Sequence, residues 1–425
     1  MIDPAVISLI ILTYLLVLLL GASEMVPLSI AALVGALLTA WFGLTYGVFA
    51  YNEALGFIDM RVLALILGTM IVVEVAYRSG LFRFAALYAI RLSRGSPRVL
   101  FMTMCIVAAG ASLFLSDQTA MLLIAATATT MAKIMNLDPI PYFVSAAIMV
   151  NLGGTSTFIG SVSNMIIGVS TGLTFTDFIS YMAAGEIALW GITIAILYYL
   201  YRSRLGEKKP LPRFDPWEGV EDRKLFNRST IILIVFLILF LTYDRFGVGP
   251  EAVALGCAVL ALTVSGFDPS EIFKRIDWET IFFLGGFYFI VGGLQKTGVL
   301  EQLSQSLLQA TAANPLNATI LTLWTTGALS AVVSNMAVAL TFTPILRGLK
   351  GLNDAALSSA LVFGTNLGGA TTPLSGSVVI MALGALKREG ISVSFREFTK
   401  VGVITSLAQM GFATLYLIAR FGLVI

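Results

Sequence analysis

The chain of 425 residues contains no histidine, two cysteines and few charged side chains, 12% of the total. The absence of histidine excludes histidine-ligated metal sites, a Ser/His/Asp triad and an imidazole proton relay. Cys105 and Cys257 lie far apart in apolar stretches, which is typical of packed hydrophobic residues rather than of a disulfide. The net charge of +2 gives no indication of a nucleic-acid partner. We therefore expect neither an enzyme nor a bound organic cofactor.

Apolar side chains make up 58% of the sequence, whereas a soluble domain is about 25% charged. A helix needs about 20 apolar residues to cross roughly 30 Å of hydrocarbon. The composition therefore predicts an all-α integral membrane protein with about ten transmembrane helices. The predicted spans are Pro4–Leu20, Val26–Leu44, Val62–Tyr77, Ile140–Thr171, Tyr181–Tyr201, Thr230–Tyr243, Pro250–Ser265, Trp278–Leu294, Ala355–Leu386 and Val401–Arg420.

Two further apolar segments, Val99–Lys133 and Ala318–Leu349, each have a polar centre, Ser116-Asp117-Gln118 in the first and Ser334-Asn335 in the second. We expect each segment to form a helical hairpin that enters and leaves on one side of the membrane. Both re-entrant hairpins and pairs of full spans agree with this pattern. Ser79–Ser93 is expected to form an amphipathic interfacial helix.

The positions of the basic residues predict the orientation in the membrane. With the N-terminus outside, most of the 26 lysines and arginines fall on the cytoplasmic side, including those of the polar segment Glu207–Arg228. We expect a multi-pass protein of the plasma membrane whose central linker is cytoplasmic. The lipid bilayer is therefore one predicted partner, and a homodimer is left open.

An internal repeat appears when the chain is shifted by 218 positions: Asp59 then pairs with Asp277 and Pro97 with Pro315. The sequence Asn-Leu-Gly-Gly begins at Asn151 and recurs at Asn366. The repeat predicts a first half at 1–205, a linker at 206–228 and a second half at 229–425. Because each half has five spans, an odd number, the two copies are expected to be inverted, an architecture typical of secondary transporters.

Two predicted spans are interrupted, at Asn151–Asn164 and at Asn366–Ser377. Paired glycines, β-branched threonines and Pro373 disfavour helix in these segments. Irregular backbone at membrane depth must be buried in protein or line a cavity, because lipid cannot satisfy its polar groups. We therefore expect two broken helices that form a binding site together with the hairpin tips.

The candidate residues for binding substrate or ion are the polar and glycine residues of these four segments. They are Ser116, Asp117, Gln118, Thr119, Asn151, Gly153, Gly154, Thr155, Thr157, Ser161, Asn164, Ser334, Asn335, Asn366, Gly368, Gly369, Thr371, Thr372 and Ser377. Amide oxygens of Asn151, Asn164, Asn335 and Asn366 are candidate Na⁺ ligands. No other metal is expected, and Na⁺ or H⁺ is the expected coupling ion.

Three carboxylates, those of Asp117, Glu74 and Glu186, lie more than two residues inside the predicted membrane segments. Asp117, at the first hairpin tip, is predicted to be the only one near the membrane centre, where a charge is costly unless it is used. If the hairpin arms are full spans, Asp117 lies instead in an external loop. Glu74 and Glu186 are expected near the ends of their spans, in hydrated positions.

At these residues the chain resembles the ArsB/NhaD permeases of the ion transporter superfamily, above all from Phe114 to Gly172 and from Asn366 to Phe398. This resemblance implies two hairpins, two unwound helices, alternating access, and ions or small anions as cargo. Many relatives have Asp-Asn at the hairpin tips, where this chain has Ser116-Asp117 and Ser334-Asn335.

We expect a secondary active transporter of a small anion or oxyacid, coupled to protons or sodium, performing either arsenite-type efflux or carboxylate transport. A sodium/proton antiporter is the alternative within transport, and an ion channel is the alternative from another class. Arsenite capture by thiols needs two or three cysteines in one place, so oxygen and amide groups would have to bind it here.

Overall fold

The computed structural model describes residues 3–23, 25–115, 117–208, 215–349, 351–373, 377–388 and 391–423. Within helices, the side chains of residues 117, 118, 125, 128, 130–134, 377, 378, 380, 381, 385 and 388 lie outside the description. The described residues form α-helices, two short 3-10 turns and loops, with no strand among them. The all-helical class predicted from composition is confirmed.

The described residues of the first half form ten helices. They are α1 (Pro4–Ser23), α2 (Leu28–Thr45), α3 (Tyr51–Leu55), α4 (Met60–Arg78), α5 (Leu81–Leu92), α6 (Pro97–Ser112), α7 (Asp117–Ile134), α8 (Pro139–Gly153), α9 (Val162–Thr171) and α10 (Phe175–Tyr201).

The described residues of the second half form ten helices in the same order. They are α11 (Arg223–Thr242), α12 (Pro250–Ser265), α13 (Pro269–Phe273), α14 (Trp278–Lys296), α15 (Val299–Ala310), α16 (Pro315–Ser330), α17 (Asn335–Arg347), α18 (Asp354–Gly368), α19 (Ser377–Arg388) and α20 (Phe395–Phe421). Short 3-10 turns at Pro216–Gly219 and Tyr243–Phe246 flank α11. Helices α4 to α6 and α14 to α16 begin and end at equivalent positions of the sequence repeat. The predicted outer limits of the two halves and of the linker stay a prediction.

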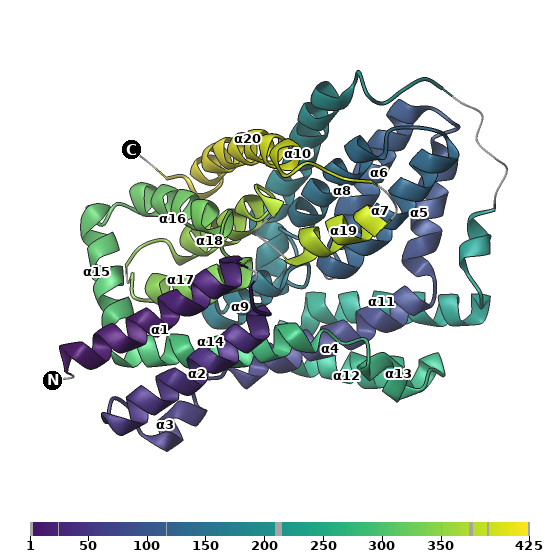
Figure 1. Ribbon diagram of the computed structural model, residues 1–425. Coiled ribbons are helices and arrows are strands. Elements are labelled where there is room, and N and C mark those ends of the chain that lie inside the picture. Colours follow the sequence, from purple (N-terminus) through teal and green to yellow (C-terminus); the bar gives the residue numbers. More distant parts are fainter. Residues whose placement is uncertain are drawn as a thin grey trace.

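The halves exchange partners in one layer of the molecule, where α2 packs on α14 and α4 packs on α12 (Figure 1). Each crossing depends on a glycine: a Cβ atom on Gly68 would lie 2.6 Å from the Ala254 carbonyl carbon. A Cβ atom on Gly286, the repeat equivalent of Gly68, would lie 2.7 Å from the Ala32 carbonyl carbon. The backbones therefore approach closely at two equivalent places, as small residues allow within membranes.

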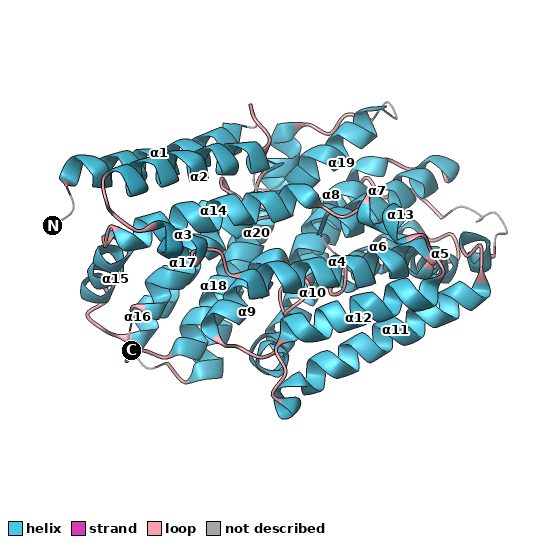
Figure 2. Ribbon diagram, turned by 90° about the horizontal axis from the view of Figure 1, so that it is seen from below, coloured by secondary structure: helices cyan, strands magenta, loops and turns pink. Residues whose placement is uncertain are grey.

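The hairpins and interrupted helices form the other layer. In the first half α6 and α7 pack on α8, in the second α16 and α17 pack on α18, and the long helices α10 and α20 pack against each other. Figure 2, viewed from below, shows the layer in which α2 packs on α14 and α4 packs on α12: α1, α2 and α14 lie side by side in one part of it, and α4, α12 and α11 lie side by side in another part. The predicted interfacial helix is α5, and its counterpart is α15.

Six of the described helical segments are long and apolar enough to cross a membrane. They are Pro4–Ser23, Leu28–Thr45, Tyr51–Arg78, Phe175–Tyr201, Arg223–Phe246 and Phe395–Phe421. The other four predicted spans are α12, α14 and the two interrupted pairs, α8–α9 and α18–α19. Helix α17 has 13 residues, about 20 Å at 1.5 Å per residue, which favours a re-entrant second hairpin over two full spans. The orientation of the termini stays a prediction.

Three predicted boundaries are wrong at helix starts. Helix α10 begins at Phe175 rather than at Tyr181, because Thr174 and Asp177 form a capping box. Helix α20 begins at Phe395 rather than at Val401. Helix α11 begins at Arg223 rather than at Thr230, because Asp222 caps it by accepting hydrogen bonds from the first turn.

Candidate functional site

The first broken helix is held open by one buried asparagine. Helix α8 ends at Gly153 and α9 begins at Val162, so the residues between them are not helical. The Asn164 side-chain amide donates hydrogen bonds to the carbonyls of Gly154 (2.8 Å), Thr155 (3.3 Å) and Thr157 (2.8 Å). These bonds satisfy carbonyl groups that a continuous helix would have paired, as burial requires.

The same asparagine joins the two halves of the chain. The Asn366 side-chain amide donates to Asn164 Oδ1 at 2.8 Å and to the Val362 carbonyl at 2.8 Å. Both asparagines are buried, and they begin or end the two predicted interruptions. The two broken helices therefore meet directly, although they are far apart in the sequence.

Each hairpin tip is bonded to the break of its own half by an equivalent hydrogen bond. Thr157 Oγ1 donates to the Leu113 carbonyl at 3.0 Å in the first half. Thr372 Oγ1 donates to the Ala331 carbonyl at 2.7 Å in the second half. Leu113 and Ala331 occupy equivalent positions of the sequence repeat, so the two tips are fixed in the same way.

The tip of the second hairpin is also bonded to α18. The Ser330 hydroxyl lies 2.6 Å from Asn335 Oδ1 and 2.7 Å from the Thr365 carbonyl. A Cβ atom on Gly369 would lie 2.6 Å from Asn335 Nδ2, so the glycine lets this asparagine lie against the second break.

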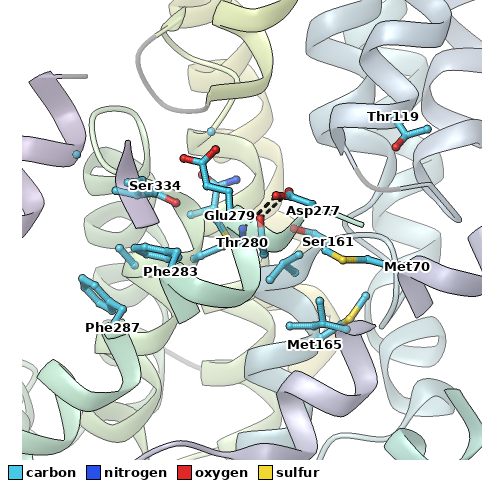
Figure 3. Close-up of a pocket in the computed structure, with 18 of the residues that line it drawn as sticks. Met70, Thr119, Ser161, Met165, Asp277, Glu279, Thr280, Phe283, Phe287 and Ser334 are labelled. Atoms are coloured by element: carbon cyan, nitrogen blue, oxygen red, sulfur yellow. Dashed lines mark hydrogen bonds between the residues drawn. The ribbon is translucent and has the colours of Figure 1, made fainter. Parts of the chain in front are cut away.

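One cavity of about 470 Å³ brings tips and breaks together, within the size range of small-molecule sites. Six of the predicted site residues line it: Thr119, Asn151, Ser161, Ser334, Asn335 and Gly369. Much of the remaining wall is apolar and comes from α1, α4, α9 and α14. Figure 3 shows Met70, Met165, Phe283 and Phe287 on this wall, with Thr119 and Ser334 on opposite sides.

Four charged residues that are not among the predicted site residues also line the cavity: Glu74, Arg275, Asp277 and Glu279. Arg275 Nε lies 3.8 Å from Glu74 Oε1. Asp277 caps α14 and accepts hydrogen bonds from the Thr280 amide (3.1 Å) and hydroxyl (2.7 Å) (Figure 3). These four residues lie at the end of the molecule that is predicted, from the positions of the basic residues, to be cytoplasmic.

Several predicted site residues lie behind the cavity wall. Gly153 and Gly368 are buried and contact the hairpin backbones: a Cβ atom would lie 2.2 Å from the Ala109 and Gly327 carbonyl oxygens, respectively. The other residues outside the cavity lining are Gly154, Thr155, Thr157, Asn164, Asn366, Thr371 and Thr372. Ser116 and the side chains of Asp117, Gln118 and Ser377 lie outside the described residues.

The hydrated position predicted for Glu186 is wrong. Glu186 is 1% exposed and accepts hydrogen bonds from the Ser156 amide and from Trp190 Nε1, the latter at 2.9 Å. Because α10 begins at Phe175, Glu186 lies three turns inside the helix instead of near its end. The capping box at Thr174 is the sequence signal that could have placed this carboxylate at depth.

Two crossed helix pairs, two hairpins and two broken helices around one cavity define a membrane transporter. Residues 14–356 match the family model of the citrate transporters, CitMHS, and the chain belongs to this family. The predicted resemblance to the ArsB/NhaD permeases therefore has the correct class, a membrane-embedded transporter, whereas the family that is matched is the citrate transporters.

Several proteins of similar sequence or structure are named as transporters. An uncharacterized transporter of Mycobacterium tuberculosis strain H37Rv is 29% identical over 410 residues, 94% of this chain and 95% of the relative. An uncharacterized transporter of Synechocystis is 26% identical, covering 94% of each chain. The YdaH transporter of Alcanivorax borkumensis has the same fold, with a TM-score of 0.65 and 16% identity over 99% of this chain and 98% of that one. The efflux pump MtrF of Neisseria gonorrhoeae has a TM-score of 0.61 and 12% identity, over 98% and 94%.

Proposed function

We propose that this protein is a secondary carrier of a small carboxylate anion of the citrate type, driven by a proton or sodium gradient. The observation that carries the proposal is the convergence of both hairpin tips and both broken helices on one cavity. The membership of a citrate transporter family supports the choice of a carboxylate over other anions.

Two helix N-termini at the cavity favour an anion. Ser161 precedes α9 and Ser334 precedes α17, and both residues line the cavity. Neither serine side chain caps its own helix, so within the part of the chain that the structure describes the first backbone amides are available to a ligand. Unpaired amides and the helix dipole together attract carboxylates. Asn151 and Asn335 provide further polar groups on the cavity wall.

The charged end of the cavity favours a cation that travels with the anion. Glu74, Asp277 and Glu279 outnumber Arg275 there, and a free polyanion would be repelled by this excess of negative charge. Hard divalent cations such as Mg²⁺ bind carboxylate oxygens, and complex formation lowers the charge of the anion. A citrate–Mg²⁺ complex is therefore the probe of choice.

Asn151 and Asn335 face the cavity and are the amide candidates for a Na⁺ site. The amides of Asn164 and Asn366 are bonded to each other and to backbone carbonyls, so they support the site from behind. Asp117 stays the candidate for coupling at the first tip, and a homodimer stays a prediction.

The alternatives are arsenite efflux, sodium/proton antiport and an ion channel. Cys105 and Cys257 are both buried outside the cavity lining, which disfavours arsenite capture by thiols. A sodium/proton antiporter needs no organic cargo, so binding of carboxylates separates it from the proposed carrier. An ion channel would conduct far faster than a carrier turns over.

A thermal-shift screen of the purified protein tests the cargo, because a ligand that binds only the folded state raises its stability. We expect citrate with Mg²⁺ to raise the melting temperature, with weaker or no effect of arsenite and sulfate. The double variant Ser334→Ala/Asn335→Ala is expected to lose the citrate shift while it still unfolds cooperatively. A shift by arsenite or Na⁺ alone, with none by di- and tricarboxylates, would contradict the proposal.

A further inference from the structure

Glu186 is a buried carboxylate with no role in the cavity lining. Its oxygens accept hydrogen bonds from the Ser156 backbone amide and from Trp190 Nε1. Ser156 belongs to the unwound segment between α8 and α9. Glu186 therefore attaches the first break to the long helix α10.

No cation among the described residues compensates this carboxylate. The helices that pack most closely on α10 are α6, α8, α11, α18 and α20. Within the part of the chain that the structure describes, none of their charged or titratable side chains forms an ion pair or hydrogen bond with Glu186. These side chains are Arg98, Cys105, Tyr142, Arg223, Lys224, Arg228, Asp354, Arg396, Glu397, Lys400, Tyr416 and Arg420, and α10 itself carries Asp177, Tyr181, Tyr198, Tyr199 and Tyr201.

The second half makes the same attachment without a charge. When α20 is aligned on α10 and α18 on α8 from their first residues, Ser406 corresponds to Glu186 and Thr371 corresponds to Ser156. Thr371 Oγ1 donates to Ser406 Oγ at 2.8 Å, and Ser406 Oγ donates to the Leu367 carbonyl at 2.9 Å. A neutral hydroxyl is thus sufficient to hold a break in this fold.

A carboxylate is costly where a hydroxyl suffices, because an unpaired charge in a low-dielectric interior is destabilising. The hydrogen-bond donors that surround Glu186 favour its ionised form, whereas its burial away from any cation favours the protonated form. The carboxyl group of Glu186 therefore binds or releases a proton when one of its hydrogen-bond donors moves, because the balance between its ionised and protonated forms then changes.

We propose that Glu186 carries the coupled proton, which it binds and releases as the first break moves during transport. This assignment rests on the proposed function as a gradient-driven carrier. The step is a proton addition: the carboxylate takes up H⁺ to form the neutral acid and gives it back as H⁺ to water. The acid accepts the Ser156 amide hydrogen bond more weakly than the carboxylate does, so protonation loosens the break.

The break connects this proton to the cargo. Gly160 and Ser161, at the far end of the same unwound segment, line the cavity. A Cβ atom on Gly154 would lie 2.6 Å from the Gly160 carbonyl oxygen, so the two ends of the segment are in close contact. A change at Ser156 is therefore transmitted to the wall that the cargo touches.

Proteoliposomes that contain Glu186→Gln test the proposal, because glutamine keeps the shape and the acceptor oxygen but does not titrate. Citrate–Mg²⁺ exchange at equal pH on both sides is expected to persist in this variant. Stimulation of uptake by an inward proton gradient is expected to fall at least tenfold. Glu186→Asp is expected to restore the stimulation with a shifted pH profile, which a purely structural role would not produce.

Ser406→Ala is the matched control, since it perturbs the equivalent attachment without a titratable group, and it is expected to keep the wild-type pH profile. Gradient stimulation and a pH profile in Glu186→Gln equal to those of the wild type would overturn the proposal. If Glu186→Gln fails to fold by gel filtration, the shifted profile of Glu186→Asp carries the test, and an unshifted profile overturns it.

Infrared spectroscopy separates this proposal from the choice of cargo. If wild-type protein moves no citrate, the proposed cargo is wrong, but the purified protein should still show the carbonyl band of a buried protonated acid that titrates with pH. That band should be missing from Glu186→Gln. Its absence from the wild type, or its persistence in the variant, would overturn the assignment of the proton to Glu186.

Discussion

The two broken helices are built alike and held differently. In each half, the unwound segment follows a glycine that packs against the backbone of a hairpin: Gly153 in the first half and Gly368 in the second. Both are bonded to a hairpin tip by a threonine hydroxyl. The first break, however, is attached to its long helix by the carboxylate of Glu186, and the second by the hydroxyl of Ser406. Features that repeat fix the geometry, so the function-specific chemistry is to be sought where the halves differ.

The largest effect is expected when a larger side chain replaces the glycine that packs against the hairpin backbone in each half. Gly153→Leu and Gly368→Leu each place a side chain into the backbone of the neighbouring hairpin, where a Cβ atom alone would lie 2.2 Å from a carbonyl oxygen. Both variants are expected to abolish transport. Uptake by proteoliposomes and gel filtration measure activity and folding. Normal transport by either variant would show that its half does not need the close approach.

Removal of the Asn164 side-chain amide is expected to have the next largest effect. Asn164→Ala leaves the carbonyls of Gly154, Thr155 and Thr157 without their donor, at a cost of about 1–3 kcal/mol for each buried unpaired group. A clear drop in melting temperature and a loss of transport are expected.

Asn366→Ala is the matched comparison, because Asn366 donates to two acceptors where Asn164 donates to three. Its melting temperature is expected to fall less than that of Asn164→Ala. A larger fall for Asn366→Ala would show that the second break, rather than the first, depends most on its asparagine.

Asp117 and Asn335 are the first residues of equivalent hairpin helices, and only the first is acidic. Asp117→Asn removes this difference while it keeps size and polarity. The variant is expected to keep cargo-for-cargo exchange and to lose stimulation by a sodium gradient, whereas stimulation by a proton gradient, which depends on Glu186, is expected to persist; uptake of labelled citrate measures both. Unaltered gradient-driven uptake would assign coupling to Glu186 and to amide and backbone oxygens instead.

The smallest effect is expected from removing the Ser406 hydroxyl, which attaches the second break to α20. Ser406→Ala removes the partner of Thr371 and one bond to the Leu367 carbonyl, and a typical hydrogen bond contributes about 0.5–1.5 kcal/mol. Thermal unfolding should show a small loss of stability, and transport should remain measurable. Complete inactivity would show that the hydroxyl has a function beyond attachment.

The sequence predicts the parts of the fold that depend on local residue types. Pro97 and Pro315 begin the hairpins, the Asn-Leu-Gly-Gly segments end helices α8 and α18, and Gly80 and Gly298 precede helices α5 and α15 with φ near +80°. These residues act through their own backbone preferences, which are visible without the fold.

The remainder of the site depends on contacts between distant residues. The hydrogen bond between Asn164 and Asn366 and the charged group around Glu74 and Arg275 form only when the halves pack together. Glu186 was misplaced because an early helix start shifted it by nearly two turns. Hydropathy marks where a span is apolar, but the capping residues determine where the helix begins.

Concentrative uptake tests the central claim most directly, namely that both halves form one gradient-driven carboxylate carrier. Proteoliposomes with wild-type protein and an inward proton or sodium gradient should accumulate labelled citrate, supplied with Mg²⁺, above its external concentration. Collapse of the gradient with an ionophore should release the accumulated citrate. Uptake that only equilibrates citrate under every gradient would contradict the account, since a channel or an uncoupled pore behaves in that way.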